Sequence, residues 1–484
     1  MIWAAFKPIN RYVNRPVGTR LRSFSISILV SISLICGVSA TMAQEAPPKL
    51  TLEQAFERAI KQHPSLARTE AQTAAIRARV HQAEAGMLPT ITLQGVATDG
   101  PQGAPAFGPI GNPANFGGVP LSVQGLAGDP LKKQFAGGVN ISQTLYDFGR
   151  TQHLVAARRE LFQAGQQDAE TQKALVLLTV QQAYYNVLRA QQLVAVGQEN
   201  LRQRDATVTQ ARAFVEGKLK AGVDLQLAQA NSAEAASALT AGQNELRYAF
   251  AALNNAMGET TLAAYQLDAL PIAANASSGT PPGPLPAVEE FVRRGLAQRP
   301  EIQSARLQRL SVEETVRGVR SELMPRLDAI ASLGVLNPSA LIRTSSNYAV
   351  GLAVTVPLYT GGAVEGRIAE EKQRRAIAIA QEREIAELVK LQVSRAWLDV
   401  QTRQAQVQSA QAQVAAASGS VQLATERYRL QLNTVVELTE AEASALRARS
   451  QLVDATFDLA VARAVLDWAA GETYRRYARP AKKP

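Results

Sequence analysis

The sequence has few of the residue types that enzymes most often use for chemistry. It contains one cysteine, Cys36, and three histidines, His63, His81 and His153, among 484 residues. The histidines lie far apart, and no closely spaced ligand set, phosphate-binding loop or nucleophile motif is present. The composition therefore predicts no metal site and no cofactor, and it argues against an enzyme.

Long apolar runs are also missing. After residue 43 no stretch approaches the ~20 consecutive apolar residues that a membrane helix needs. Any crossing of a membrane must therefore use strands. Aromatic residues make up only 5% of the chain, whereas alanine, glutamine and leucine are abundant, which favours long helices over a compact enzyme.

The N-terminal segment has the pattern of a secretory signal. Its basic residues, with no acid among them, are Lys7, Arg11, Arg15, Arg20 and Arg22. An apolar and serine run over residues 24–38 follows, and small residues end it at Ala43, so we expect a signal peptide over residues 1–43. Ile35 precedes Cys36 where lipid attachment needs a small residue, so lipid anchoring is not expected. The formal net charge is +10; half of it lies in this segment, and nucleic acid is a poor partner for the rest.

The chain repeats itself. A shift of 213 residues places residues 146–259 on residues 359–472 without a gap, so that Leu145-Tyr146 falls on Leu358-Tyr359. A second shift, of 236 residues, pairs upstream dipeptides such as His63-Pro64 and Arg299-Pro300. The chain is therefore two copies of one structural unit. The predicted organisation is repeat one at 50–259, a linker at 260–286, repeat two at 287–472 and a basic tail at 473–484.

A seven-residue period runs through both copies. Its members are Val180, Val187, Val194, Leu201, Val208 and Val215 in the first copy, and Val393, Val400, Val407, Val414, Val421 and Tyr428 in the second. This period predicts helices that pack lengthwise as coiled coils. The roughly 70 proline-free residues 149–217 predict a helix of about 105 Å. Short connections at 217–223 and 430–436 make each pair of helices a hairpin, preceded by shorter helices at 52–87 and 288–323.

The pattern changes to a period of two after Pro325. Apolar residues alternate with small or polar ones over 327–335 and 348–356, and less cleanly over 90–98 and 135–146. These lengths suit strands that cross a bilayer. A sheet of four strands has two free edges, which cannot lie in lipid. If these strands cross a membrane, the chain must therefore oligomerise to close the sheet. The alternative is that they cover a soluble core. The intervening segment 100–130 is rich in glycine and proline, which predicts an irregular exposed loop.

Taken together, these residues resemble the outer-membrane efflux proteins of the TolC type. The stretches that carry the likeness are Leu50-Thr51-Leu52-Glu53-Gln54-Ala55, His63-Pro64, Leu88-Pro89, Leu145-Tyr146-Asp147-Phe148-Gly149, and Pro357-Leu358-Tyr359 with Gly362. The resemblance implies a mainly α fold with a membrane β-barrel, built as a homotrimer whose twelve strands close the barrel and whose twelve helices form a periplasmic tunnel. It also implies a passive exit duct of a tripartite efflux or type I secretion system. Its partners would be a periplasmic adaptor, an inner-membrane transporter and outer-membrane lipid.

The same resemblance implies where the entrance of the pore lies. Glu437 and Glu440 match the positions of the family's acidic ring, so three copies would bring six carboxylates together and attract cations. Glu437 has an alternative role, because Thr434 and Glu437 also form the pattern of a helix capping box.

Matches to the family also predict a latch and an adaptor contact at the hairpin tips. Asp224 and Tyr428 correspond to a polar link that holds the entrance shut. Asn433 stands where the family has an arginine, and the usual tip glycine is displaced, which predicts a weaker latch. The predicted adaptor contacts are Gly217, Lys218, Lys220, Gln431 and Asn433, although the two lysines could serve solubility alone. A soluble periplasmic coiled-coil adaptor or spacer is the rival reading, but an adaptor normally has one hairpin flanked by β-rich domains.

Overall fold

A computed structural model describes residues 48–99, 133–259, 263–268, 285–337 and 345–473. The predicted signal peptide and the predicted loop at 100–130 lie outside the described residues. So do most of the predicted linker and all but the first residue of the predicted tail. The described part of the linker contains a short strand that pairs with the start of the first repeat.

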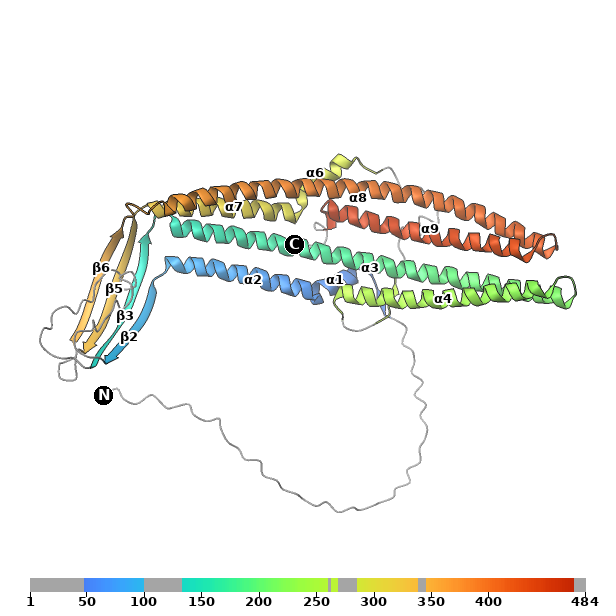
Figure 1. Cartoon of the computed structure of the whole chain (residues 1–484), viewed down its shortest axis with the longest axis horizontal. Helices are drawn as coiled ribbons and strands as arrows, with labels where there is room; N and C mark the ends of the chain where they lie inside the picture. Colours follow the sequence, from blue (N-terminus) through green and yellow to red (C-terminus); the bar gives the residue numbers. More distant parts are fainter. Residues whose placement is uncertain (1–47, 100–132, 260–262, 269–284, 338–344, 474–484) are drawn as a thin grey trace, which may run out of the picture. The chain divides into compact units, whose positions relative to one another are not determined.

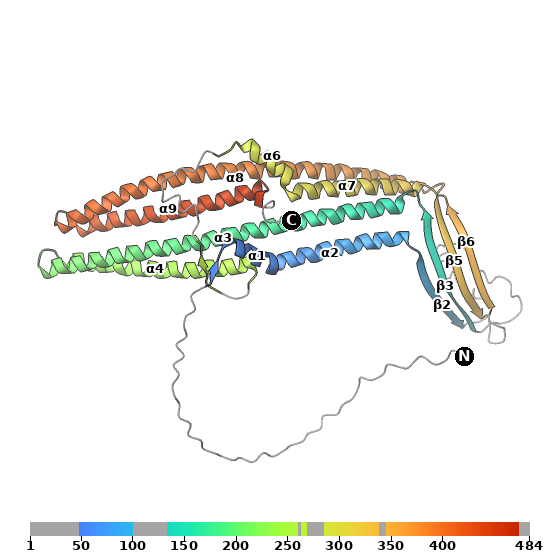
Figure 2. The same cartoon turned by 180° about the vertical axis from the view of Figure 1, so that it is seen from behind.

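Each repeat contains the same elements in the same order (Figures 1 and 2). In the first they are β1 (Lys49–Leu50), α1 (Leu52–Gln62), α2 (Pro64–Glu84), β2 (Thr90–Asp99), β3 (Lys133–Tyr146), α3 (Arg150–Glu216) and α4 (Gly222–Met257). In the second the corresponding elements, preceded by β4 (Gln266–Leu267) in the predicted linker, are α6 (Val288–Gln298), α7 (Pro300–Arg320), β5 (Arg326–Asn337), β6 (Ser345–Thr355), α8 (Ala363–Arg429) and α9 (Val435–Ala469). The predicted mainly α fold of two repeats, each with a strand pair and a long helical hairpin, is confirmed.

The upstream helix of each repeat is broken, which corrects the continuous helices expected at 52–87 and 288–323. His63 has φ −68° and ψ 122°, and it ends α1 and caps α2, where its Nδ1 accepts a hydrogen bond from the Ser65 N–H at 3.2 Å. A residue before proline avoids the helical region, and proline is well placed at the first position of a helix. The same break recurs at Arg299, before Pro300.

The two long helices have equal length. α3 and α8 span 67 residues each, or about 100 Å, and each follows a glycine in the left-handed region, Gly149 and Gly362. α3 packs along α4, and α8 packs along α9. Four residues of the predicted seven-residue period are fully buried: Val180 and Val187 on α3, and Val393 and Val400 on α8.

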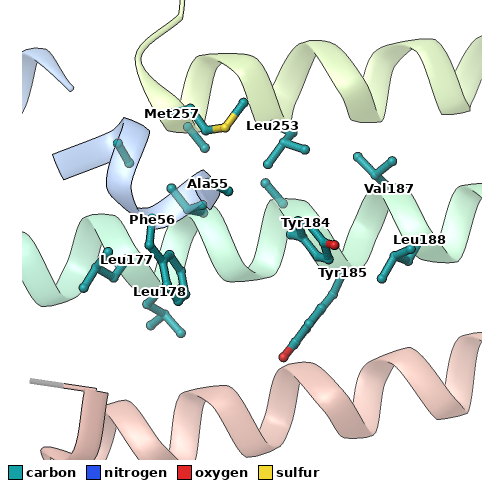
Figure 3. Close-up of a cluster of buried hydrophobic side chains, with 14 of the residues drawn as sticks. Ala55, Phe56, Leu177, Leu178, Tyr184, Tyr185, Val187, Leu188, Leu253 and Met257 are labelled. Atoms are coloured by element: carbon teal, nitrogen blue, oxygen red, sulfur yellow. The ribbon is translucent and has the colours of Figure 1, made fainter. Parts of the chain in front are cut away.

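The largest core cluster joins α1 to the first hairpin (Figure 3). Phe56 of α1 lies against α3, and Leu253 and Met257 of α4 close the cluster from the other side. The hydroxyl of Tyr184 donates a hydrogen bond to the Leu50 carbonyl at 3.1 Å, so the short strand β1 is held on α3. This cluster fixes the middle of the hairpin and leaves its tip to pack separately.

The four long strands form one antiparallel sheet in the order β2-β3-β5-β6. Alternation gives the sheet two unlike faces: Ile91, Ile141, Ala331 and Val350 lie opposite one another in register on one face. On the other face the Thr90 and Ser142 hydroxyls are 2.7 Å apart, and the Thr144 hydroxyl donates to Asp328 at 2.9 Å. The apolar face is largely exposed in the single chain.

The two repeats meet through α3 and through β3. α3 contacts α2 and α4 of its own repeat and also α7 and α9 of the second repeat, and β3 pairs with β5. α8 contacts α6, α7 and α9, all from its own repeat. Within the described residues, no helix is both long enough and apolar enough to cross a membrane.

Candidate functional site at the hairpin tips

A small hydrophobic cluster joins the tips of the two hairpins. Tyr428 of α8 is fully buried with Val435 and Leu438 of α9, and Phe214 and Leu227 of the first hairpin pack against them. The rings of Phe214 and Tyr428 meet edge to face, with centroids 5.6 Å apart, a favourable arrangement for aromatic pairs. The structure thus brings the two predicted tip segments together.

Lys220 of the first tip reaches across to the second. Its Nζ donates a hydrogen bond to the Asn433 carbonyl at 3.1 Å and lies 5.7 Å from the centre of the Tyr428 ring. Asn433 itself is buried, and its amide nitrogen donates to the Ala424 carbonyl at 3.2 Å. The ammonium group of Lys220 therefore supplies the positive charge at the contact between the two tips, whereas Lys218 is exposed.

Among the described residues, the two predicted latch residues, Asp224 and Tyr428, form no hydrogen bond with each other. Burial raises the pKa of Tyr428, and the Asp224 carboxylate raises it further. The Tyr428 hydroxyl is buried and has no hydrogen-bond partner within the described part of the chain. The predicted hydrogen bond between the phenol and the Asp224 carboxylate is therefore not formed in the single chain.

Both tips make the same turn, and neither uses glycine for it. Lys218 and Gln431, which are equivalent in the 213-residue repeat, have φ values of 58° and 63°. Gly217 has φ −72° and ends α3 in the ordinary helical region. The left-handed region is unfavourable for residues with a Cβ atom by about 1–2 kcal/mol. Each tip therefore carries local backbone strain, at Lys218 in the first and at Gln431 in the second. Gly217 does not relieve the strain in the first tip, because it lies one residue before the strained position.

Replacing Lys218 by glycine should stabilise the first tip by about 1 kcal/mol, because glycine adopts the left-handed region without strain. Amide hydrogen exchange over residues 215–223 should slow by about fivefold. Lys218→Ala is the matched control, because it removes the charge and keeps the Cβ atom. Equal slowing in both variants would show that charge, not backbone strain, sets the stability of the tip.

Glu437 and Glu440 lie at the start of α9 with exposed side chains. The Thr434 hydroxyl accepts a hydrogen bond from the Glu437 N–H at 3.3 Å, which is one half of the predicted capping box. The carboxylate of Glu437 does not complete the box, whereas α1 has both halves of one. Among the described residues, neither carboxylate forms an ion pair or a hydrogen bond, so both are available to a pore.

One buried polar site at the α3–α9 boundary is not predicted by any sequence pattern. Arg204 of α3 and Glu442 of α9 are both buried, with Nη1 and Oε2 2.9 Å apart. The Thr207 hydroxyl donates to Glu442 Oε1 at 3.1 Å, and Arg204 Nη2 donates to the Thr439 carbonyl at 3.4 Å. Burial raises the pKa of Glu442, opposed by the charge of Arg204 and by the Thr207 hydrogen bond. The one sequence feature that could have pointed to this ion pair is a difference between the repeats. Arg204 is charged, whereas its equivalent in the second repeat is Ala417.

The tips also carry exposed apolar residues that no sequence pattern singles out. Leu219 and Val223 in the first tip, and Leu432 and Val436 in the second, are all exposed. The two pairs are equivalent in the 213-residue repeat. Exposed apolar side chains that recur at the same place are typical of contact surfaces. Among the described residues, no group of three or more His, Cys, Asp and Glu side chains could hold a metal ion.

Comparison with known proteins identifies relatives along most of the chain. The model of the family described as "Outer membrane efflux protein" matches residues 55–259 and 292–472. Outer membrane efflux protein BepC of Brucella suis biovar 1 (strain 1330) is 24% identical over 327 residues, which cover 67% of this chain and 69% of BepC. Outer membrane protein TolC of Vibrio cholerae is 26% identical over 231 residues, covering 46% of this chain and 51% of that protein.

Solved structures share the fold. The open state of the MtrE outer membrane channel of Neisseria gonorrhoeae superposes with a TM-score of 0.70 at 18% identity, covering 89% of this chain and 91% of MtrE. The CmeC outer membrane channel of Campylobacter jejuni superposes with a TM-score of 0.71 at 17% identity, covering 87% and 85%. These proteins are named as channels and efflux proteins.

Proposed function

Because the chain belongs to the outer membrane efflux protein family, we propose that three copies of it form a closed exit duct. The protein resides in the outer membrane and extends into the periplasm. It serves as the outer-membrane exit duct of an efflux system. In the proposed assembly an inner-membrane transporter and a periplasmic adaptor deliver the cargo, and the duct carries out no chemistry. The family relationship and its channel relatives favour this duct over a soluble adaptor or spacer.

The exposed face of α8 is the observation that carries the proposal. Ile377, Leu391 and Leu398 are 55%, 65% and 57% exposed. Their repeat equivalents on α3 are Ala164, Leu178 and Tyr185, which are 2%, 7% and 6% exposed. The difference arises because α3 has neighbours from both repeats and α8 from one. The α2 and α4 helices of a second copy would cover α8 as α7 and α9 cover α3.

The sheet leads to the same conclusion. In the repeat, β6 is equivalent to β3 and β2 is equivalent to β5. Because β3 pairs with β5, we expect β6 of one copy to pair with β2 of the next. In the single chain, β2 and β6 are the two open edges of the sheet. An open edge cannot lie in lipid, because its backbone groups would lack partners. In the proposed barrel the apolar face, with Leu93, Leu333 and Tyr348 in register, would contact lipid. The polar face with Thr144 and Asp328 would line the lumen.

The tips would form the periplasmic entrance and the adaptor contact. The exposed pairs Leu219 with Val223 and Leu432 with Val436 would give six equivalent apolar contacts in a trimer, and Lys218 would add a charge to three of them. Gly217, Gln431 and Asn433 would shape the turns between these contacts. Lys220 is less suited to reach an adaptor, since its ammonium group is bound to Asn433.

Replacing Glu437 and Glu440 together by glutamine should reduce the cation selectivity of the duct, because a ring of six carboxylates attracts cations at the entrance. The reversal potential across a salt gradient should move toward zero in planar bilayers. Glu426→Gln is the control, since Glu426 is an exposed acid on the last turn of α8. An unchanged reversal potential in the double variant would place both carboxylates outside the pore.

Membrane fractionation followed by bilayer recording tests the function as a whole. We expect a urea-resistant protein that requires detergent for extraction and forms discrete channels after reconstitution. A protein released from cells without detergent, with no channel activity, would support the soluble spacer instead.

A further inference from the structure

The apolar face of the sheet ends in an aromatic pair where β3 passes into α3. Tyr146 lies in register with Leu327 of β5, and Leu327 lies in register with Val354 of β6. Leu327 shares its face with Leu333, since alternate residues of a strand point to the same side, and this face would contact lipid in the proposed barrel. The rings of Tyr146 and Phe148 have centroids 4.8 Å apart, and both side chains are exposed. The pair therefore marks the edge of the apolar face that is nearest to the helices.

Phe148 is held in place against the preference of its backbone. Its φ is 53°, in the left-handed region, whereas its equivalent in the second repeat is Gly361, with φ 64°. The Phe148 carbonyl accepts a hydrogen bond from the Ser321 hydroxyl at 2.9 Å. Ser321 begins η2 (Ser321–Leu323), the short turn between α7 and β5. Strained residues that neighbouring segments hold in place are common at ligand-binding sites. The turn alone does not require a phenylalanine, because the second repeat makes it with glycine.

Two arginines at the starts of the long helices share one carboxylate beside this turn. Glu322 of η2 lies 3.2 Å from Nη2 of Arg150, the first residue of α3, and 2.5 Å from Nη1 of Arg367 on α8. The Glu322 side chain is 11% exposed, whereas those of Arg150 and Arg367 are 49% and 53% exposed. A guanidinium group has five N–H donors. Both arginines therefore keep accessible donors for a further acceptor, while the covered carboxylate fixes their positions.

The aromatic pair and Arg150 are exposed although their surroundings are already occupied. Within the chain α3 contacts α2 and α7, and α7 contacts α3 and α8. Added copies would cover α8 and the sheet edges, not the junction between β3 and α3. The nearby acid Asp147 is engaged as a cap of α3, where it accepts a hydrogen bond from the Thr151 N–H at 2.8 Å. Asp147 therefore does not occupy the donors of the two arginines.

The two parts of this surface fit one kind of molecule. Arginine binds phosphate oxygens through paired N–H donors, and two guanidinium groups on one carboxylate lie within reach of a common phosphate. Tyrosine and other aromatic rings at the edge of a lipid-facing surface lie at the level of the headgroups. Free phosphate would account for the arginines alone, and an apolar chain would account for the aromatic pair alone. A phospholipid offers both groups.

We propose, on the basis of the outer-membrane duct and barrel proposed above, that Arg150 and Arg367 bind the phosphate of a phospholipid in the periplasmic leaflet. The rings of Tyr146 and Phe148 pack on the glycerol and upper chains of the same lipid. Glu322 is the positioning residue that orients the two arginines. The proposed trimer would carry three such sites, one in each chain.

Native mass spectrometry of the detergent-extracted protein, titrated with dioleoylphosphatidylglycerol, tests the proposal. The test variant combines Arg150→Gln, Arg367→Gln and Glu322→Gln, so no carboxylate is left covered without its partners. Glu322→Gln alone is the first control, because it keeps both arginines and an oxygen that accepts from them. Arg212→Gln with Arg427→Gln is the second control, because it removes two exposed arginines of the same helices near the tips.

We expect the lipid to bind the test variant about tenfold more weakly than the natural protein, because charge-assisted hydrogen bonds to the phosphate are lost. Both controls should keep most of the binding. Dioleoylglycerol, which has the same chains and no phosphate, should not distinguish the natural protein from the test variant. A loss in either control as large as in the test variant would overturn the proposal, as would equal binding of the two lipids to the natural protein. Inorganic phosphate that binds as tightly as the lipid would show a free-phosphate site instead.

Bilayer recording separates failure of this proposal from failure of the proposed function. The test variant should still form channels of unchanged conductance. Channels from the natural protein without the expected lipid preference would contradict the lipid site alone, whereas no channels from the natural protein would contradict the duct. Channels lost only in the test variant would show that the arginines hold the junction together, and that result would also overturn the lipid site.

Discussion

Replacing Arg204 by alanine should destabilise the contact between α3 and α9 by about 3–5 kcal/mol, the usual cost of leaving one member of a buried ion pair without its partner. Glu442 would keep only the hydrogen bond from Thr207. Amide hydrogen exchange near residues 204 and 442 should accelerate by about 10²- to 10³-fold or more.

The repeat offers a matched control for this substitution. Arg204→Ala with Glu442→Gln recreates the Ala417 and Gln229 combination found at the equivalent positions. The double variant contains no buried charge, so it should recover most of the lost stability. If Arg204→Ala alone leaves exchange unchanged, or if the double variant is as unstable as the single one, the ion pair does not hold the hairpins together.

The effect of Arg204→Ala should also depend on pH. Burial raises the pKa of Glu442, and Arg204 opposes that rise, so removing Arg204 should raise the pKa further. An acid whose pKa is higher in the folded than in the unfolded state binds its proton more tightly when folded. Its contribution to stability is therefore full below the unfolded pKa and is lost as the pH rises through the folded pKa. The exchange difference between the variant and the natural protein should be smaller at about pH 5 than at about pH 8.

Arginine at Leu391 and Leu398 together should abolish assembly. Both residues are exposed on α8 in the single chain, and both have buried equivalents on α3. A buried guanidinium without a partner costs several kcal/mol, and the closed symmetry would repeat each substitution at every boundary. Size-exclusion chromatography with light scattering in detergent should show single chains.

Leu388→Arg is the matched control on the same helix. Leu388 is 50% exposed, and its equivalent Leu175 is 43% exposed even though α3 has neighbours from both repeats. That position should therefore remain exposed in the assembly, and arginine there should be tolerated. Assembly of the Leu391 and Leu398 variant, or loss of assembly in the Leu388 variant, would contradict the predicted boundary.

The helices and strands whose apolar residues recur at a regular short spacing could be predicted from the sequence. The seven-residue spacing from Val180 to Val215 predicts a helix and its buried side at once, because both follow from helical geometry. Alternation over 348–356 predicts β6 in the same way. The break at His63 was harder to predict, because a proline such as Pro64 fits both the first turn of a helix and a kink inside one.

The site depended on contacts that spacing does not encode. Arg204 and its ion-pair partner Glu442 lie in different repeats, and a charged residue on a long helix is usually solvated, so the buried ion pair could not be expected. The turns were easier to place. Glycine is the usual residue in the left-handed region, and the displaced tip glycine points to the positions that Lys218 and Gln431 occupy, both of which have positive φ.

The mass of the detergent-extracted particle tests the central claim most directly. In the proposed duct, copies of the chain would cover the open face of α8 and the open edges of β2 and β6 in a closed ring. Native mass spectrometry should give a particle of three chains and no larger or smaller stable species. A particle of one chain, or a series of sizes without closure, would contradict the account.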